Sequence, residues 1–285
     1  MTSISAIDGR YRAKVHHLDD YFSEYALIKY RVKVEVEYFL FLGEQKFFTV
    51  PAALKKHLQK AAEDFSLSDA KKVKAFEKTT NHDVKAVEYF LKEKLDGAGH
   101  SNLKEWIHFG LTSQDVNNTA IPLLWKHALE FEYVPALLNL NREIGLLAKK
   151  WRDIPLLART HGQPASPTKL GKELMVFVDR IENQVELLLK TPISAKFGGA
   201  TGNFNAHHIA YPSKNWIAFA DKFVENKLQL KRQQFTTQIE HYDNLAAHFD
   251  ALKRINAILV DFCRDIWTYI SMEYFKQQTV KGEIG

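Results

Sequence analysis

The 285-residue sequence contains a single cysteine, Cys263, and little glycine or proline. One cysteine excludes a disulfide framework and a thiolate metal cluster, and it suits a reducing compartment. The 13 glycines and 8 prolines are fewer than an average chain of this length contains. Because the turn chemistry of an all-β sandwich is scarce, the composition favours helices.

Long apolar runs are also missing. The N-terminal segment has no apolar core of signal-peptide length, and no later run approaches the roughly 18 apolar residues of a membrane span. We therefore expect a cytoplasmic protein without a membrane partner. Hydrophobic residues make up 46% of the sequence and charged residues 26%, a mixture that excludes intrinsic disorder and low-complexity scaffolds. The net charge of +5 fits an anionic partner.

The longest helical pattern lies near the C-terminus, over residues 243–275. Its apolar residues recur at intervals of three and four, and neither glycine nor proline interrupts it. At 1.5 Å per residue this segment would form a rod of about 50 Å. A wide apolar stripe on so long a helix predicts a helical bundle.

Two further segments show the same periodicity. Residues 168–190 predict a long helix, with Ser166 as its N-cap and Pro167 at its first position. Residues 115–150 predict another, in which Pro122 marks a first turn and Pro135 a kink or break. Together the three segments outline the core of an all-α bundle.

The N-terminal part of the chain is organised differently. Its elements look shorter, and the Asp-Gly-Ala-Gly stretch at 96–99 is the clearest break in pattern. We expect an N-terminal helical domain over 1–105 and a central long-helix bundle over 106–285. The irregular stretch 191–215 contains three glycines but lacks the phosphate-loop ending and the dinucleotide spacing, which favours a long connection.

The first polar segment whose side chains could bind a ligand or take part in a reaction is Thr-Thr-Asn-His-Asp at 79–83. Thr80 and Asp83 match a loose capping box, which would place His82 at a helix N-terminus. Free N–H groups and a partial positive charge favour an anionic ligand there. The alternative is that Asn81 and Asp83 only cap the helix.

The second polar segment covers residues 106–115, where Thr112 and Asp115 match another loose capping box. The hydroxyls of Thr112 and Ser113, with the adjacent N–H groups, could bind a carboxylate. His108 lies four residues earlier and could extend such a pocket. The alternatives are a capped helix and a semi-buried histidine.

The third polar segment is Arg-Thr-His-Gly-Gln-Pro-Ala at 159–165. It predicts a loop between the apolar run 154–158 and the long helix that follows Pro167. His161 can act as an acid or a base near neutral pH, and Gly162 would let the backbone approach a ligand. A structural turn is the alternative, but three histidine-bearing segments at helix starts favour a shared site.

No pattern predicts a metal or a cofactor. His207 and His208 are adjacent and therefore point in different directions, and no His-Glu-x-x-His, Cys-x-x-Cys or Gly-x-Ser-x-Gly motif occurs. Lysines and arginines are interspersed with acids, and runs such as Lys71-Lys72 are short. The basic residues therefore predict a solvated surface, without nucleic acid as a partner.

The three polar segments also resemble a known family. Their most specific feature is the helix start Asn-His-Asp followed by Val-Lys-Ala-Val-Glu-Tyr-Phe, at 81–90. Together with Thr112-Ser113 and the 159–165 motif, it is similar to the bacterial adenylosuccinate lyases of the fumarase/aspartase superfamily. The resemblance covers essentially the whole chain and extends to the motifs at 8–11, 202–207 and 236–240.

The resemblance implies a fold and an activity. The family catalyses two elimination steps of purine biosynthesis, which release fumarate from adenylosuccinate to give AMP and from succinylated aminoimidazole carboxamide ribotide. Its members are all-α homotetramers built on a long central bundle. Each active site is shared by three subunits, and no cofactor or metal is needed. The implied partners are succinyl nucleotides and further copies of the chain.

The resemblance also implies roles for individual residues. His161 is the general acid that protonates the departing purine nitrogen, and His82 lies beside it and orients the substrate. The succinyl part is contacted by Thr112, Ser113 and Gln238, and the nucleotide and its phosphate by Arg10, Tyr11, Asn81, Asp83 and His108. Removing a proton next to a carboxylate builds an aci-carboxylate dianion, which fixed donors around that carboxylate stabilise.

One departure from the family pattern concerns the general base. The family uses a serine in a mobile Gly-Ser-Ser-x-Met-Pro-x-Lys-x-Asn-Pro loop, and this sequence ends at residues 281–285, where that loop would start. We interpret the chain as part of a longer enzyme whose C-terminal domain is absent here, and we expect it to be inactive alone. The rival interpretations are another superfamily lyase, such as argininosuccinate lyase, a non-catalytic helical scaffold and a nucleic-acid binder.

Overall fold

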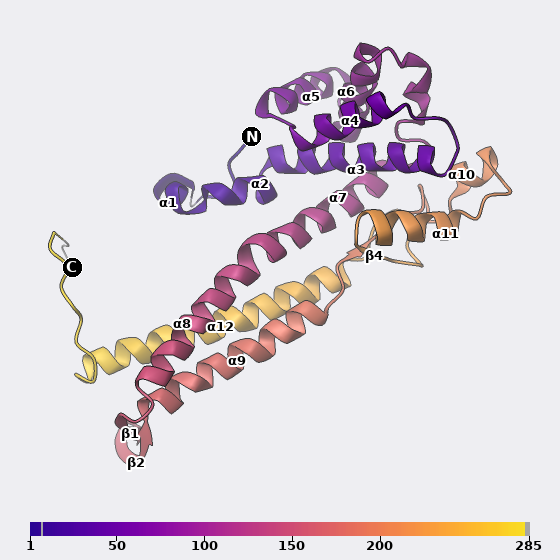
Figure 1. Ribbon diagram of the computed structural model, residues 1–285. Coiled ribbons are helices and arrows are strands. Elements are labelled where there is room, and N and C mark those ends of the chain that lie inside the picture. Colours follow the sequence, from indigo (N-terminus) through magenta and orange to yellow (C-terminus); the bar gives the residue numbers. More distant parts are fainter. Residues whose placement is uncertain (7, 283–285) are drawn as a thin grey trace. The chain divides into compact units, whose positions relative to one another are not determined.

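The computed structural model describes residues 1–6 and 8–282, and it is mostly helical, as the composition predicts (Figure 1). The final Glu-Ile-Gly, at which we expect the serine loop to begin, lies outside the described residues. The chain forms two compact units. The first comprises Met1–Glu132 and Pro192–Tyr242, and the second comprises Tyr133–Thr191 and the residues from Asp243 onward.

The first unit contains most of the elements. They are α1 (Asp8–Val15), η1 (His16–Leu18), α2 (Asp19–Phe22), α3 (Glu24–Glu44), α4 (Ala52–Glu63), α5 (Leu67–Thr80), α6 (Asp83–Gly97), η2 (Ser101–Trp106), α7 (Ser113–Ala128), β3 (Ser194–Ala195), α10 (Asn205–Ala210), α11 (Trp216–Asp221), η4 (Lys222–Lys227) and β4 (Lys231–Arg232). The strands β3 and β4 form a short parallel pair. The connection predicted over 191–215 therefore includes a strand and a short helix.

Helix α3 is the centre of this unit. One of its faces, represented by Tyr38, packs against α7, α11 and η4, and the opposite face, represented by Phe39, packs against α4, α5 and α6. The expectation of only short elements before residue 106 is wrong here, because α3 spans 21 residues. A helix that is apolar on both faces has no amphipathic period, and this removes the signal that periodicity analysis needs.

The two hydrophobic clusters also bear on domain organisation. The cluster around Tyr38 joins residues from both sides of residue 105, including Leu123 and Trp216. The compact units therefore divide at other positions. The division at residue 105 stays a prediction about domain architecture.

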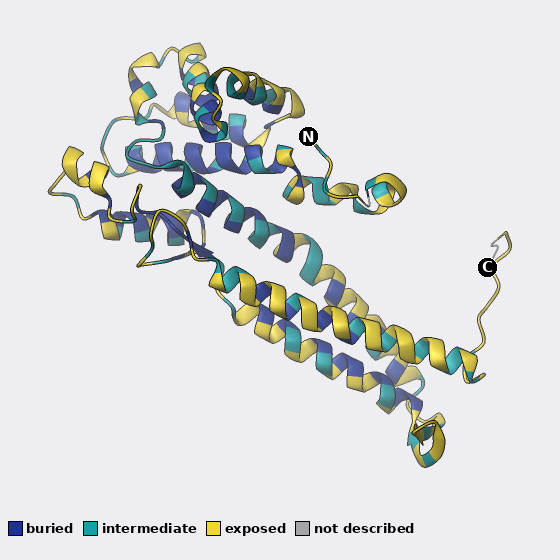
Figure 2. Ribbon diagram, turned by 180° about the vertical axis from the view of Figure 1, so that it is seen from behind, coloured by how far each residue is buried: buried dark blue, intermediate teal, exposed yellow. Residues whose placement is uncertain are grey.

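The second unit is built from three long helices and one hairpin. The elements are α8 (Val134–Lys150), β1 (Pro155–Thr160), β2 (Gln163–Lys169), α9 (Leu170–Lys190) and α12 (Asp243–Ser271). Helix α9 packs against both α8 and α12. Figure 2 shows a long exposed face on α12, which includes Phe249, Val260 and the 75%-exposed Trp267.

The structure corrects several predicted helix boundaries. The helix expected from residue 168 begins at Leu170 with Lys169 as its N-cap, because Ser166 and Pro167 belong to strand β2. Pro122 lies inside α7 and not in a first turn. The kink or break predicted at Pro135 corresponds to a local change in the helix: a π-helical turn, η3 (Leu129–Tyr133), joins α7 to α8, and Pro135 stands in the first turn of α8.

The last long helix is slightly shorter than expected, because α12 ends at Ser271. Among the helices of the described residues, no stretch has the length and apolar character needed to cross a membrane.

Candidate active site

Helix α7 begins at the Thr112-Ser113 pair. Thr112 is the N-cap, and its N–H donates to Asp115 Oδ2 at 2.9 Å, as a capping box requires. The box predicted from sequence is therefore confirmed. The hydroxyls of Thr112 and Ser113 stand at the positive end of a 16-residue helix, where an anionic group is stabilised.

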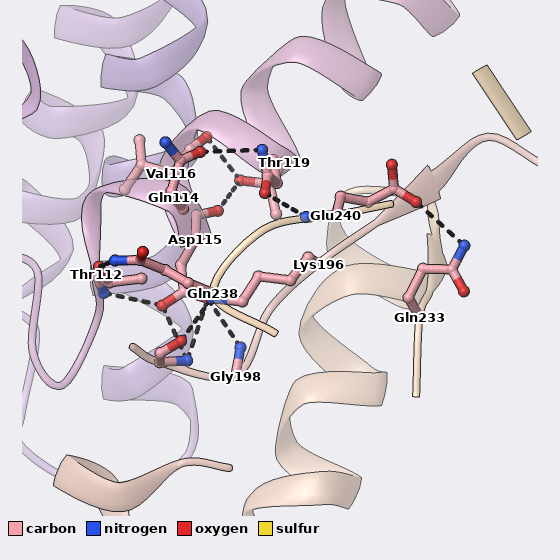
Figure 3. Close-up of polar contacts among 12 residues, drawn as sticks. Thr112, Gln114, Asp115, Val116, Thr119, Lys196, Gly198, Gln233, Gln238 and Glu240 are labelled. Carbon is pink, nitrogen blue, oxygen red and sulfur yellow. Dashed lines mark hydrogen bonds and ion pairs between the residues drawn. The ribbon is translucent and has the colours of Figure 1, made fainter. Parts of the chain in front are cut away.

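Asp115 is more than a capping residue. Its fully buried carboxylate receives hydrogen bonds from Lys196 Nζ at 2.7 Å and from the Gly198 and Gly199 N–H groups at 2.8 and 3.0 Å (Figure 3). Lys196 is also fully buried, and burial lowers its pKa although Asp115 opposes that shift. A salt bridge with both partners buried thus fixes the glycine-containing connection to the start of α7.

The pair of Asp115 and Lys196 was not predicted from the sequence. Asp115 appeared only as a cap, and Lys196 stood in a segment interpreted as a plain connection. A lysine 81 positions away carries no local signal of its partner. The Gly198-Gly199 pair next to it was the only trace, because backbone N–H groups can approach a carboxylate closely where side chains are absent.

The glycine connection also contacts the segment before α12. Gly202 has φ +78, and a Cβ there would lie 2.5 Å from the Thr236 carbonyl oxygen. A glycine is therefore required at this position. The close approach brings the Thr236–Gln238 stretch against the connection.

A second buried residue of α7, Asn118, binds the residues that follow this stretch. Asn118 accepts a hydrogen bond from the Glu240 N–H at 2.7 Å and donates to the Tyr242 hydroxyl at 2.6 Å. As a result Gln238 Nε2 lies 3.5 Å from Thr112 Oγ1, as Figure 3 shows. Two segments far apart in the sequence thus meet at the start of α7, where Gln238 lies beside Thr112 and Ser113 is the next residue of the chain.

His82 begins helix α6, as predicted, but by a different mechanism. The histidine itself is the N-cap, and its Nδ1 accepts a hydrogen bond from the Lys85 N–H at 3.2 Å. The predicted capping box of Thr80 with Asp83 is wrong, because Thr80 is the last residue of α5 and Asp83 is the first residue of α6. With Nδ1 accepting, the neutral His82 ring carries its hydrogen on Nε2, and its side chain is half exposed.

The residues on either side of His82 have separate roles. Asn81 is the left-handed C-cap of α5 at φ +52, a conformation that asparagine tolerates well. Asp83 accepts a hydrogen bond from Arg31 at 2.6 Å. Burial opposes ionisation of Asp83, but the Arg31 guanidinium dominates the other causes and the pKa is lowered overall.

His108 is mostly buried between α3 and α6. Its Nδ1 lies 2.5 Å from Glu35 Oε1, and its Nε2 lies 3.9 Å from Glu88 Oε1. Burial alone would lower its pKa, but the two carboxylates outweigh burial and raise the pKa. Glu35 was not singled out from the sequence, because an acid on an otherwise apolar pattern gave no motif. Glu88 belongs to the motif at 81–90, but no role was predicted for it.

His161 belongs to the second unit. The polar loop predicted around it is the tip of the β1–β2 hairpin, in which Thr160 pairs with Gln163. His161 and Gly162 form the two-residue turn with φ +52 and +75, as a type I′ turn requires. The extended flanks were missed because Gln-Pro-Ala-Ser-Pro at 163–167 has the composition of a loop. The imidazole is exposed at the tip.

Arg10 and Tyr11 lie on α1, which has no buried residue. The Arg10 guanidinium stands 5.5 Å from the centre of the Tyr11 ring. Both side chains are exposed. These two predicted nucleotide contacts therefore lie on a helix, α1, that is held by little packing.

The histidine pair at 207–208 divides between core and surface. His207 is fully buried, and desolvation lowers its pKa to about 4. Its Nε2 lies 3.1 Å from the Tyr38 hydroxyl, while His208 is exposed. Over the described part of the chain, no group of three His, Cys, Asp or Glu side chains is arranged to hold a metal ion.

The chain as a whole is similar to known proteins. Residues 9–285 match the family described as lyase. The chain belongs to the lyase family. This lyase chain is 55% identical over 299 residues to the adenylosuccinate lyase of Dictyostelium discoideum and 45% identical over 290 residues to that of Escherichia coli strain K12. Both alignments cover 100% of this chain and 63% of the relative.

Solved structures share the fold of this lyase chain. Fumarate lyase from Mesorhizobium sp. BNC1 matches with a TM-score of 0.74 at 18% identity, over 90% of this chain and 58% of that one. The 3-carboxy-cis,cis-muconate lactonizing enzyme from Pseudomonas putida matches with a TM-score of 0.70 at 22% identity, over 90% and 56%. The lyase chain therefore spans a little under two thirds of the length of its curated relatives and has the expected superfamily fold.

Proposed function

We propose that this chain supplies the substrate-binding and proton-donating residues of an adenylosuccinate lyase, which eliminates fumarate from adenylosuccinate to leave AMP. By the same chemistry it would release fumarate from succinylated aminoimidazole carboxamide ribotide. The observation that carries the proposal is the meeting of Thr112, Ser113 and Gln238 at the start of α7. This arrangement supplies hydroxyl, amide and backbone donors for a carboxylate.

The proposed elimination breaks one C–H and one C–N bond. A base removes the proton from the carbon next to a succinyl carboxylate, and the electron pair passes into that carboxylate to form an aci-carboxylate dianion. The donors of Thr112, Ser113 and Gln238 stabilise the charge that develops there. When the pair returns, the C–N bond breaks and fumarate forms.

His161 is the proposed general acid. It gives its proton to the purine nitrogen as that nitrogen departs, which avoids an anionic leaving group. Its exposed place in a two-residue turn leaves the imidazole accessible from solvent. His82, with Nδ1 occupied by the Lys85 N–H, presents Nε2–H as a donor that orients the substrate.

The nucleotide is proposed to bind at the other polar segments, through Arg10, Tyr11, Asn81, Asp83 and His108. His108 and Arg10 supply positive charge for the phosphate. The partner is therefore a small succinyl nucleotide, not nucleic acid or membrane, and the proposed location is the cytoplasm. No residue of the described chain needs a cofactor or a metal for these steps.

A homotetramer with shared active sites is part of the proposal. Large apolar side chains remain exposed on the three helices of the second unit, including Leu146, Leu189 and Trp267. Such faces are stabilised when other copies of the helices cover them. A monomeric mass in light scattering at micromolar concentration would contradict this assembly.

Calorimetric titration with adenylosuccinate tests the function directly. We expect saturable binding of adenylosuccinate and none of argininosuccinate. Binding of argininosuccinate alone would favour that lyase instead, and binding of neither would favour a non-catalytic scaffold. A salt-sensitive shift with single- or double-stranded nucleic acid would support a nucleic-acid binder.

A further inference from the structure

Three polar residues form a stripe on the central helix α3. Arg31, Glu35 and Tyr38 are separated by four and three residues, so they lie on one face of the helix. They are 7%, 0% and 0% exposed. Polar side chains this deeply buried are stabilised only by specific partners.

Apart from His207, which contacts the Tyr38 hydroxyl, the partners of the stripe lie in or next to segments that carry predicted site residues. Arg31 donates to Asp83 at the start of α6 and, at 2.8 Å, to Asn117 of α7. Glu35 contacts His108. The Tyr38 hydroxyl donates to the carbonyl oxygen of Phe109, the residue after His108, at 2.8 Å. One helix therefore fixes the approach to Thr112 and the start of α6 at the same time.

The contact between Glu35 and His108 has two unusual features. Glu35 Oε2 is buried and has no hydrogen-bond partner among the described residues. His108 has φ +60, a strained backbone conformation for a residue with a side chain. Packing alone explains neither feature, and both are typical of a side chain held for function.

The charged groups around His108 come from three helices. Glu35 of α3 and Glu88 of α6 face the ring, and the field of Asp115 from α7 adds to theirs. Lys85 binds Glu88 at 2.7 Å and offsets part of its charge. Burial opposes protonation, yet the carboxylates outweigh it and raise the pKa of His108, which favours the charged ring near neutral pH.

We propose that Glu35 is a positioning residue, which holds the His108 ring through Nδ1 as a charged donor for the nucleotide phosphate. With Nδ1–H directed at Glu35 Oε1, the hydrogen on Nε2 remains available to an anion that displaces the 3.9 Å contact with Glu88. This inference rests on the proposed nucleotide-binding function. It adds Glu35, which does not contact the substrate but controls the charge and the orientation of His108, which does.

The first test follows the titration of His108 by ¹H–¹⁵N NMR in wild type and in Glu35→Gln, with His108→Gln to assign the signal. We expect the His108 pKa to fall in Glu35→Gln, because burial lowers this pKa and one of the carboxylates that raise it is then removed. The matched control is Glu37→Gln on the same helix, since Glu37 faces Lys33 and Lys227 instead. A His108 pKa that is equal in wild type and Glu35→Gln would overturn the proposal.

The second test measures AMP affinity by calorimetry at pH 7.5 and pH 5.5. We expect Glu35→Gln to raise the Kd about 10-fold at pH 7.5, as for the loss of a charge-assisted hydrogen bond. At pH 5.5 the loss should shrink, because lowering the pH favours protonation of the variant ring. Comparing variant with wild type at each pH cancels the titration of AMP itself. An equal loss at both pH values would indicate a structural role and overturn the proposal.

Two further comparisons separate the possible failures. In a His108→Gln background, Glu35→Gln should cause no additional loss of AMP affinity, and a full additional loss would contradict the pairing. If Glu35→Gln does not fold, Glu88→Gln must lower the His108 pKa in the same direction. Wild-type protein that binds no AMP would refute the proposed function, while the NMR titration would still decide whether Glu35 controls His108.

Discussion

The buried Lys196–Asp115 pair allows the clearest stability prediction. Lys196→Met keeps a similar side-chain volume but removes the ammonium that lies 2.7 Å from Asp115 Oδ1, with both side chains fully buried. Removing one partner of a buried ion pair leaves an uncompensated charge, which costs about 3–5 kcal/mol. The N–H groups of Thr112, Gly198 and Gly199 still donate to Asp115, so we expect the lower end, about 3 kcal/mol.

The chain offers a matched control. Lys231 Nζ also lies 2.7 Å from a carboxylate, that of Glu225, but the two side chains are 64% and 38% exposed. Exposed pairs contribute about 0–1 kcal/mol. Lys231→Met should therefore leave the free energy of unfolding nearly unchanged. The comparison tests burial, because in both variants a methionine replaces a lysine whose Nζ lies 2.7 Å from a carboxylate oxygen. Lys196 Nζ also donates to the Gly199 carbonyl oxygen, and that bond is lost only in Lys196→Met.

Urea unfolding followed by far-UV circular dichroism, at equal protein concentrations, measures both variants. The double variant Asp115→Asn with Lys196→Met should lose less than the sum of the two single losses, since no buried charge is left without a partner. Succinyl-nucleotide binding should also weaken in Lys196→Met because the glycine connection loses its attachment to α7. If Lys196→Met costs no more than Lys231→Met, the argument from burial is wrong.

The remaining predictions concern the proposed site and the pH response. Thr112→Ala and Ser113→Ala should each weaken adenylosuccinate binding by about 1–3 kcal/mol in calorimetry, while unchanged affinity with a lowered melting temperature would mean that they only cap the helix. In a preparation that shows the proposed lyase activity, His161→Gln should lower turnover by roughly 10² to 10⁴ without changing the oligomeric mass, and near-normal turnover would remove the acid assignment. Gly162→Ala should destabilise the hairpin by about 1–2 kcal/mol because φ is +75 there, detectable as a lower melting temperature. Since burial lowers the His207 pKa from 6.5 to about 4, the unfolded chain binds more protons between these values. Stability should therefore fall as pH drops from 6.5 to 4, and a flat urea midpoint over that range would contradict the burial of a neutral ring.

The sequence alone determined the helical class and the long helices. The apolar stripes of residues 168–190 and 243–275 have the helical period, so α9 and α12 were predictable to within a few residues. The same holds for one cap: the Thr-x-x-Asp pattern at 112–115 identified the start of α7, because its hydrogen bonds join residues three positions apart. The same pattern at 80–83 did not form a capping box, because His82 is the N-cap of α6. Interactions between residues that are close in the sequence can be predicted from the sequence pattern.

The tertiary structure decided what joins these segments. Asp115 with Lys196, Glu35 with His108 and Asn118 with Glu240 are separated by 81, 73 and 122 positions, and no periodicity encodes such pairs. The two-residue turn at His161 likewise depends on cross-strand pairing. A buried polar group is stable only where its partner is also present, so each of these three pairs depends on the tertiary structure. The sequence therefore identified the residues of the proposed chemistry, and packing around α3 and α7 decided which of them meet.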